Sequence, residues 1–316
     1  MEIDKSIYIA GHTGMVGSAL RRKLKESGYE HIITRTHQEL DLLDQAAVAD
    51  FFESQRPDYV FLAAGKTGGI YANNTYRADF IYENIVIQSN IIQQSFLNEV
   101  QKLMFYACSC MYPKACSQPM AEEHLLTGPL EPTNEPFALA KIVGLKMCES
   151  FNRQYGTDFI TLIPTNVYGP NQRYEPMNSL VVPSLLQKFH KAKIQEEDGV
   201  VIWGSGRPVR DLLYVDDLAD ASLYLMTHCE GNVVLNVGTG REVSVAELAE
   251  IVKQEVGYEG DIIYDASLPD GVERKLQDLS KLTSLGWSFR VELAEGIHLA
   301  YQDFLQRIER GERLLF

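Results

Sequence analysis

Three glycines near the start of the chain have a spacing that suits the binding of a phosphate group. They lie in the run Gly11-His12-Thr13-Gly14-Met15-Val16-Gly17, which follows a strand-like segment at 7–10 and opens a helical segment at 16–26. Residues without a side chain permit a tight turn and let backbone N–H groups approach a pyrophosphate at the positive end of a helix. This context predicts a dinucleotide-binding turn, with a glycine turn that holds no ligand as the alternative. The residues assigned to the cofactor here are Gly11, Thr13, Gly14, Met15, Val16 and Gly17.

The residues after the second predicted strand bear on which dinucleotide is bound. The run Thr34-Arg35-Thr36-His37 has Arg35 where an NAD-binding chain usually carries an acid for the ribose 2′-hydroxyl. A guanidinium pairs with a 2′-phosphate, whereas a carboxylate repels it. The sequence therefore favours NADP(H) over NAD(H), although a solvated surface arginine is the alternative reading.

The first two-thirds of the chain alternate strand-like and helix-like runs, and these elements must position the residues named above. Strands are expected at 7–10, 31–34, 59–62, 103–107 and 159–163, with amphipathic segments between them. This alternation predicts an α/β fold, a Rossmann-type doubly wound parallel sheet with a smaller C-terminal substrate-binding lobe. We expect the nucleotide-binding domain at 1–170 and the lobe at 171–316, with about 210–240 returning to the first domain.

Composition narrows the choice of partners. The chain has 316 residues, 45% hydrophobic and 23% charged, and a formal net charge of −14. Such a charge argues against nucleic acid as a partner, so an anionic ligand must be held by local basic groups and helix N-termini. No leader and no apolar run near the ~20 residues of a membrane span is seen, so we expect no membrane association.

The chain has five cysteines, which could serve as metal ligands or as disulfide partners. Cys108 and Cys110 are spaced more tightly than the Cys-x-x-Cys of zinc or redox sites, so no metal is expected. The five cysteines are expected to form no paired framework, which fits a reducing, cytoplasmic setting. They are Cys108, Cys110, Cys116, Cys148 and Cys229.

Runs along essentially the whole chain resemble the extended short-chain dehydrogenase/reductase family, and most closely the GDP-L-fucose synthases within it. The runs that carry this resemblance are 10–18, 68–76, 78–82, 131–136, 164–170, 203–206, 236–240, Pro269-Asp270-Gly271 and Arg274-Lys275. Such enzymes epimerise carbons 3 and 5 of a GDP-4-keto-6-deoxyhexose and then reduce it with NADPH. The resemblance therefore implies bound NADP(H), a GDP-sugar site in the C-terminal lobe, and a homodimer formed through a four-helix interface by helices near 80–96 and 137–151.

The resemblance also implies binding roles for individual residues. Trp203 is expected to stack on guanine, and Lys188, Arg210 and Arg274 to pair with the diphosphate or ribose. The further cofactor residues are Asp41, Leu42, Ala63, Ala64, Lys141, Pro164, Asn166 and Val167. The further substrate residues are Asn166, Val181 and Leu185.

The catalytic positions are where this chain departs from the pattern. The Tyr-x-x-x-Lys pair reads Phe137-Ala138-Leu139-Ala140-Lys141, so Lys141 is retained to hold the ribose while Phe137 has no proton to donate. The serine that polarises the keto oxygen corresponds to Cys108, with Ser109 beside it. The epimerisation cysteine is retained as Cys110, but its histidine partner corresponds to Leu180. Cys110 as a small buried hydrophobe is the alternative reading.

These substitutions leave two functions open. The first is NADPH-dependent reduction at C4 of a GDP-4-keto sugar, with weak or no epimerisation at C3 and C5. The proton would come from water, from a ribose relay with Lys141, or from Ser109 or Tyr106. The second is a catalytically silent paralogue that binds nucleotide and GDP-sugar and acts as a partner or regulator.

Overall fold

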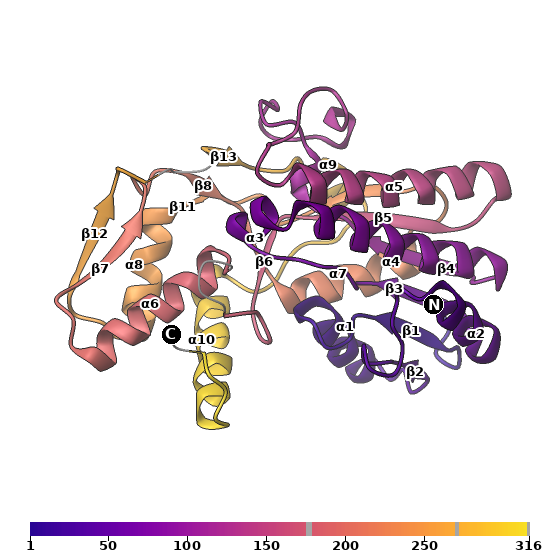
Figure 1. Cartoon of the computed structure of the whole chain (residues 1–316), viewed down its shortest axis with the longest axis horizontal. Helices are drawn as coiled ribbons and strands as arrows, with labels where there is room; N and C mark the ends of the chain where they lie inside the picture. The colour runs from indigo at the N-terminus through magenta and orange to yellow at the C-terminus, as the bar shows by residue number, and fades with distance from the viewer. Residues whose placement is uncertain (175–178, 269–271, 315–316) are drawn as a thin grey trace.

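Six parallel strands form the central sheet of the protein. The computed structural model describes residues 1–174, 179–268 and 272–314, and the strand order in its main sheet is β10-β5-β4-β3-β1-β2 (Figure 1). The strands are β1 (Ile7–Ala10), β2 (Ile32–Ile33), β3 (Tyr59–Leu62), β4 (Lys102–Tyr106), β5 (Phe159–Pro164) and β10 (Val234–Val237). The strand order reverses between β1 and β3, and this is the switch point at which open α/β sheets bind ligands.

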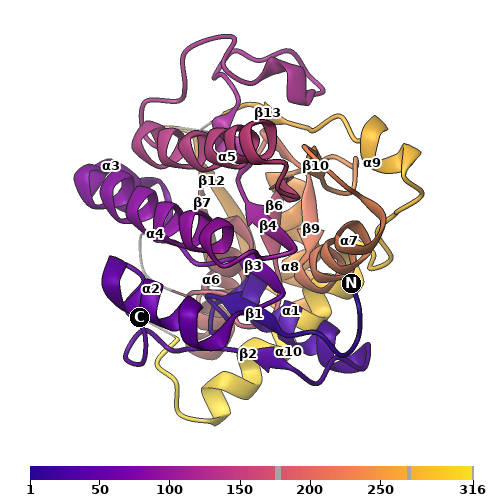
Figure 2. The same ribbon diagram turned by 90° about the vertical axis from the view of Figure 1, so that its right-hand side faces the viewer.

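The middle strands are buried along their whole length because helices cover both faces of the sheet. One face is covered by α1 (Met15–Glu26) and α7 (Val215–His228), which share an apolar core with β1 and β3. The other face is covered by α2 (Gln45–Gln55), α4 (Arg77–Leu97) and α5 (Glu135–Tyr155) (Figure 2). The prediction of a Rossmann-type doubly wound sheet is confirmed.

A smaller lobe with its own apolar core lies beyond the sheet (Figure 1). Its helices are α6 (Val181–Gln195), α8 (Val245–Val256) and α10 (Leu293–Glu309). Its strands are β7 (Gly199–Trp203), β12 (Asp261–Asp265), β8 (Val209–Arg210), β11 (Val243–Ser244) and β13 (Arg274–Lys275). The remaining elements are α3 (Ile70–Thr75), η1 (Ser109–Met111), η2 (Glu122–His124), β6 (Asn166–Tyr168), β9 (Leu212–Tyr214) and α9 (Ser280–Ser284).

The chain passes more than once between the sheet and the lobe. After α6 and β7 it returns to the sheet through α7 and β10, and Leu282 and Trp287 also pack in the core under α1 and α7. The domain boundaries expected at about 170 and at 210–240 stay predictions. Pro269-Asp270-Gly271 lies outside the described residues. Within the described part of the chain, no helix is long and apolar enough to cross a membrane.

Helices α4 and α5 cross closely at Gly144. A Cβ placed on Gly144 would lie 2.4 Å from Cζ of Phe105 and 2.8 Å from Oε1 of Gln88. Gln88 is buried and donates from its amide to the Ala140 carbonyl at 2.5 Å. The position therefore has no room for a methyl group, because the neighbouring atoms belong to a strand-core ring and a bonded side chain.

We expect Gly144→Ala to lower the free energy of unfolding by about 1 to 3 kcal/mol, the usual cost of overpacking a core. Chemical denaturation at constant pH would measure it. Ser150→Ala, an exposed position further along α5, serves as the control and should change stability by less than about 0.5 kcal/mol. Equal stability of Gly144→Ala and the native chain would show that the two helices can separate freely.

Candidate active site

The glycine turn fits tightly against the end of β3. Gly11 has φ of 86°, and a Cβ there would lie 2.7 Å from the backbone nitrogen of Ala64. A Cβ on Gly17 would lie 2.2 Å from the Gly11 carbonyl oxygen. Gly14 is the N-cap of α1, and its N–H donates to the Gly11 carbonyl at 3.0 Å. Thr13 and Gly14 remain exposed, so the backbone at the helix start is open to a ligand phosphate.

Asn171 ties this turn to the C-terminal lobe, and no sequence signal had marked it. Its amide donates to the Thr13 carbonyl at 2.7 Å and to the Ser18 hydroxyl at 3.3 Å. Its backbone N–H donates to Asp303 on α10 at 2.9 Å. One residue therefore contacts both the phosphate turn and the last helix.

Arg35 lies against α2 in this structure. Its guanidinium is 5.4 Å from the centre of the Phe51 ring and donates to the Thr34 carbonyl at 2.8 Å and to Gln55 at 3.4 Å. His12 lies within the glycine turn, and its Nδ1 is buried without a hydrogen-bond partner among the described residues. Burial, and then the charge of Arg21, lowers the pKa of His12.

Asp41 and Leu42 lie on the loop between β2 and α2. The Asp41 carboxylate accepts the backbone N–H of Leu43 at 2.9 Å, and the Leu42 carbonyl accepts the amide of buried Asn90 at 2.9 Å. Ala63 continues β3, with its N–H donating to Ala10 at 3.0 Å. The turn, this loop and the end of β3 therefore line one edge of the sheet.

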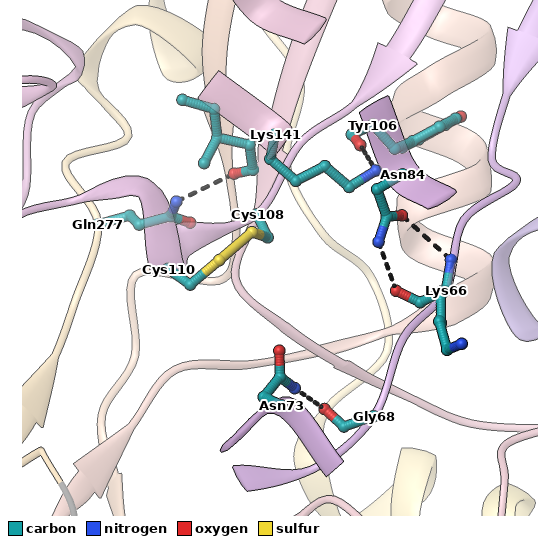
Figure 3. Close-up of a disulfide and its surroundings, with 10 residues drawn as sticks. Lys66, Gly68, Asn73, Asn84, Tyr106, Cys108, Cys110, Lys141 and Gln277 are labelled. Atoms are coloured by element: carbon teal, nitrogen blue, oxygen red, sulfur yellow. Dashed lines mark hydrogen bonds between the residues drawn. A yellow bond between two sulfur atoms is a disulfide. The ribbon is translucent and has the colours of Figure 1, made fainter. Parts of the chain in front are cut away.

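Lys141 on α5 reaches the same edge and is almost completely buried (Figure 3). Its ammonium donates to the Tyr106 carbonyl at 2.9 Å and lies 4.9 Å from the Phe105 ring centre and 5.8 Å from that of Phe137. A Cβ on Gly65, just past β3, would lie 3.7 Å from Nζ. Burial lowers the pKa of Lys141 to about 8.

The backbone beside Lys141 is held by a buried asparagine on α4. Asn84 accepts the N–H of Lys66 at 3.0 Å and donates to the carbonyls of Lys66 and Phe80 at 3.1 and 2.7 Å (Figure 3). These bonds fix the segment after β3, because both ends of the amide are engaged. The backbone segment that faces Lys141 is therefore held in place by the side chain of Asn84.

Phe137 and Lys141 lie on one face of α5, as the four-residue spacing predicts. Phe137 packs edge-on against Phe80, with ring centres 6.1 Å apart. Leu180, in the position of the family histidine, precedes α6 and is half exposed. Neither side chain can exchange a proton.

Cys108 and Cys110 are joined by a disulfide. The prediction that no cysteines pair is wrong for these two, because the single turn of η1 folds them back toward each other. Both are partly exposed, which also excludes Cys110 as a fully buried hydrophobe, while Ser109 between them is buried. Cys116, Cys148 and Cys229 are free.

Tyr106 is wrong as a candidate proton donor. Its hydroxyl donates to Ser222 of α7 at 2.6 Å and is buried on the sheet face opposite α5. Burial raises the pKa of Tyr106 and of Tyr112 far above the ordinary range. The Tyr112 hydroxyl donates to Asn236 at 2.6 Å.

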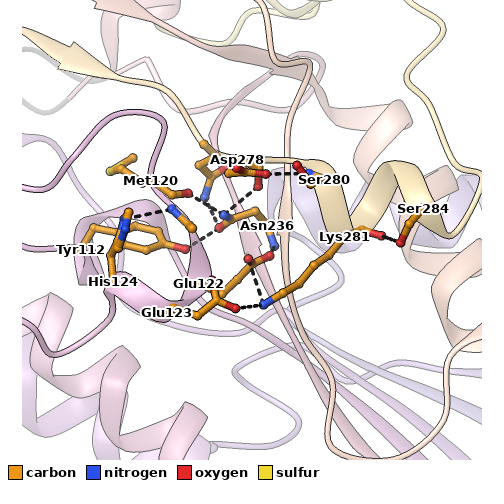
Figure 4. A network of polar contacts seen from close by, with 12 residues as sticks. Tyr112, Met120, Glu122, Glu123, His124, Asn236, Asp278, Ser280, Lys281 and Ser284 are labelled. Atoms are coloured by element: carbon orange, nitrogen blue, oxygen red, sulfur yellow. Dashed lines mark hydrogen bonds and ion pairs between the residues drawn. The ribbon is translucent and has the colours of Figure 1, made fainter.

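Asn236 on β10 organises the loops behind the cysteines (Figure 4). Its side-chain oxygen accepts from Tyr112 and, at 2.9 Å, from Gln277, while its amide donates to the carbonyls of Met120 and Asp278 at 2.9 and 3.0 Å. Three segments far apart in sequence, 112–120, Asn236 on β10 and 277–278, therefore meet at one buried side chain.

The substrate residues expected from the sequence lie in and beside the lobe. Lys188 on α6 donates to the Val201 carbonyl at 2.8 Å and lies 5.8 Å from the ring centre of Trp203, which is about half exposed at the end of β7. Val181 begins α6, and Leu185 is buried in the lobe core. Burial lowers the pKa of Lys188.

Cationic residues meet across the short strands β8 and β13. Lys275 pairs in register with Arg210, and burial, followed by the Arg210 charge, lowers the pKa of Lys275 to about 8. Lys275 is a candidate that the sequence assignment missed, although it stands in a run that carries the resemblance. Arg274 instead forms an exposed pair with both carboxylate oxygens of Glu242, with Nη2 donating to Oε2 at 2.9 Å.

Pro164 and Asn166 lie where the chain leaves the sheet for the lobe. Asn166 donates to the carbonyl of Asp211 at 3.4 Å, and Thr165 donates to the same carbonyl at 3.0 Å. Val167 packs against the core under α1. Within the described residues, no cluster of three or more His, Cys, Asp or Glu could hold a metal ion.

A switch-point glycine turn and a buried lysine on α5 at the same sheet edge define a dinucleotide-binding enzyme of the Rossmann type. Residues 7–238 match the NAD dependent epimerase/dehydratase family, and the chain belongs to this family.

Several relatives match almost the whole chain. The GDP-L-fucose synthase of Escherichia coli (strain K12) is 51% identical over 313 residues, which cover 96% of this chain and 98% of the relative. A GDP-6-OMe-4-keto-L-xylo-heptose reductase from Campylobacter jejuni matches with a TM-score of 0.92 and 40% identity, covering 97% of this chain and 99% of that one. A GDP-mannoheptose C4 reductase from the same organism, solved with NADP bound, matches with a TM-score of 0.90 and 42% identity over 96% of this chain and 99% of that one. The resemblance to GDP-L-fucose synthases is confirmed.

The buried ammonium of Lys141 should leave a pH signature in stability. Its folded pKa of about 8 lies below the ordinary value of about 10.4 for lysine. The unfolded chain therefore binds more protons in this window, and stability gains from Lys141 as pH rises through it. Lys141→Met lacks this gain. From pH 7 to 10 the difference in unfolding free energy between native protein and variant should shift by about 3 kcal/mol in favour of the native protein.

Urea unfolding at a series of pH values would measure this difference. The exposed Lys146→Met on the same helix is the control and should show no such trend. A pH-independent difference for Lys141→Met would mean that Lys141 titrates normally.

Proposed function

We propose that this protein reduces a GDP-linked 4-keto sugar at C4, with NADPH as the hydride donor. The observation that carries the proposal is the buried Lys141 ammonium. It lies beside Gly65, at the same end of the parallel strands as the glycine turn. The identity to GDP-L-fucose synthase over the whole chain and the similarity to GDP-sugar C4 reductases support it. NADPH supplies the hydride when bound.

The residues at the sheet edge fit a dinucleotide. A Cβ at Gly11 would collide with the backbone of Ala64, and one at Gly17 with the backbone of Gly11, so only glycine lets the turn close this tightly. The exposed backbone at Thr13 and Gly14 then offers its N–H groups to an anion at the start of α1. We assign the pyrophosphate to the start of α1, the adenine to Asp41 and Leu42, and the nicotinamide ribose to Lys141. Ala63, Ala64, Pro164, Asn166 and Val167 complete this assignment. We assign the 2′-phosphate to Arg35, whose guanidinium packs on Phe51.

The lobe offers a site for the GDP part of the substrate. Trp203 has an exposed ring face for guanine, and Lys188 lies over that ring. Arg210 and Lys275 place two cations side by side, an arrangement that a diphosphate stabilises. We assign Val181, Leu185 and Asn166 to the walls of this site. Arg274 is a weaker candidate because Glu242 already neutralises it.

Lys141 is the group that we assign to proton delivery. Hydride addition at C4 leaves an alkoxide, which needs a proton. Phe137 has none to give, and a cysteine thiol at position 108 is only a weak hydrogen-bond donor. The lowered pKa of Lys141 puts both its protonation states within reach near neutral pH. Its ammonium protonates the alkoxide directly or through a ribose hydroxyl and is then reprotonated by water. Ser109 lies nearby but is buried within η1.

Epimerisation at C3 and C5 should be weak or absent. That reaction requires one group to remove a carbon-bound proton and another to return one. Leu180, which stands at the position of the second proton-transfer group, is a half-exposed hydrocarbon and can do neither. The substrate is therefore a sugar that already has its final configuration at C3 and C5.

We further propose that the protein is a homodimer that acts in the cytoplasm. Large apolar side chains are exposed on the outer faces of α4 and α5, among them Tyr82, Leu97, Leu139 and Tyr155. A second copy covering these helices would form a four-helix interface around a two-fold axis.

The direct test is consumption of NADPH with a panel of GDP-4-keto sugars, both hexoses and heptoses. We expect turnover with NADPH, much slower turnover with NADH, and loss of turnover in Lys141→Met. The same reaction in deuterated water should place little deuterium at C3 and C5. If NADPH and GDP-sugar bind but no sugar is reduced, the silent-paralogue reading replaces this one.

Restoring the missing phenol at position 137 should show whether proton transfer limits turnover. Phe137→Tyr places a hydroxyl on the ring that lies 5.8 Å from Lys141 Nζ. General acid catalysis is worth roughly 100- to 10,000-fold, so the turnover number should rise by at least about tenfold while KM changes little. Phe151→Tyr, further along the same helix, is the control and should leave the turnover number unchanged. An unaltered rate in Phe137→Tyr would mean that proton transfer does not limit turnover.

A further inference from the structure

The disulfide between Cys108 and Cys110 lies in the candidate active site, close to Lys141 (Figure 3). Both cysteines are partly exposed at the carboxyl end of β4, where small molecules can reach them. Cys148 and Cys229 are buried, and Cys116 contacts His124 at 3.4 Å in a separate loop. The pair thus differs from Cys148 and Cys229 in its exposure, and from Cys116 in its position near Lys141.

The backbone holds the two cysteines at bonding distance. Cys108 caps η1, and its carbonyl accepts the N–H of Met111 at 3.2 Å, which closes a single tight turn. The turn is anchored by buried Met111 and Tyr112. The two Cα atoms are 5.4 Å apart, within the range that disulfide geometry requires. Oxidation therefore needs no rearrangement of the chain.

Two buried amide oxygens, those of Gln277 and Asn73, have no hydrogen-bond partner among the described residues. The Gln277 amide donates to the Ile163 carbonyl at 3.0 Å and to Asn236 at 2.9 Å, and the Asn73 amide donates to Gly68 and Gly69 at 2.7 and 3.0 Å. Their nitrogen ends are thereby identified, so the oxygens can only accept. A thiol is a weak hydrogen-bond donor and a disulfide has no proton, so oxidation removes the donor that each cysteine offers in its reduced form.

We propose that Cys108 and Cys110 form a reversible redox pair that controls the reductase, which is active in its dithiol form. This inference rests on the proposed function for its effect on turnover. Oxidation by a peroxide breaks two S–H bonds and one O–O bond and forms one S–S bond, and hydrogen peroxide leaves as two molecules of water. A small dithiol reverses the reaction and becomes the disulfide itself.

The active form is the reduced one because of what Cys108 can offer to the substrate. It stands at the position at which the resemblance places the serine that polarises the keto oxygen. A thiol there retains a weak hydrogen-bond donor, whereas the bridge removes it. Loss of one positioned donor to a developing oxyanion typically lowers turnover on the order of 100-fold.

The test compares fully reduced protein with protein treated with hydrogen peroxide and then freed of it. Peptide mass spectrometry should find a Cys108–Cys110 bridge in native protein and in Cys116→Ser, and none in Cys108→Ser or Cys110→Ser. Oxidation should lower NADPH-dependent turnover by roughly 10- to 100-fold, and dithiothreitol should restore it. Turnover of the two single-cysteine variants should no longer respond to peroxide, while Cys116→Ser should respond as native protein does.

The bridge is detected without any assay of catalysis, so failure of the redox proposal can be distinguished from failure of the proposed reductase function. Absence of the bridge after peroxide treatment overturns the redox pair, whatever the reaction. A bridge that forms and reopens without changing turnover overturns its control of the enzyme. If no sugar is reduced at all, the proposed function fails, and the pair is then judged by calorimetric binding of GDP-sugar. Equal affinity of the oxidised and reduced forms overturns it.

Discussion

The candidate site depends on a lysine ammonium held out of water. The Lys141 ammonium donates to the Tyr106 carbonyl and otherwise lies near the rings of Phe105 and Phe137 and the backbone at Gly65. Burying a charge with so little compensation costs free energy, and the chain bears this cost through the dense packing of α4 against α5. Asn84 and Gly144 are part of the same packing, because one fixes the wall facing Lys141 and the other lets the helices approach. The site is therefore preorganised by its hydrocarbon surroundings as much as by its polar groups.

Much of this arrangement could be predicted from local sequence. The glycine turn, the buried strands and the Phe137–Lys141 face follow from short-range periodicity, which depends only on backbone geometry. Arg35 shows the limit of that reasoning, because its type was visible but its direction is set by Phe51 and Gln55 on another element. The roles assigned to individual binding residues stay predictions.

Features formed by distant segments could not be read from the sequence. Asn171 meets Thr13 across more than a hundred residues, and Lys275 meets Arg210 only because β13 pairs with β8. The Cys108–Cys110 bridge is local in sequence, yet the spacing of the two cysteines alone does not predict it, because it depends on the turn of η1 between them. The signal for such a bridge is a tight turn between the cysteines, which composition does not reveal.

The sheet and the lobe are joined by a buried carboxylate that is not part of the chemistry. Asp211 is fully buried, and burial raises its pKa. Its carboxylate accepts the hydroxyl of Thr239 at 2.6 Å and the backbone N–H groups of Thr239 and Gly240 at 3.0 and 3.2 Å. Its own carbonyl accepts from Thr165, which lies at the exit from β5. The chain thus crosses between the two units at a fixed junction.

Asn171 forms a second connection between the sheet and the lobe. It contacts the exposed phosphate turn through Thr13 and the lobe through Asp303. One asparagine thus holds the start of α1 and the last helix of the lobe together through its side chain and its backbone N–H, so loss of either bond would loosen the contact between the glycine turn and α10.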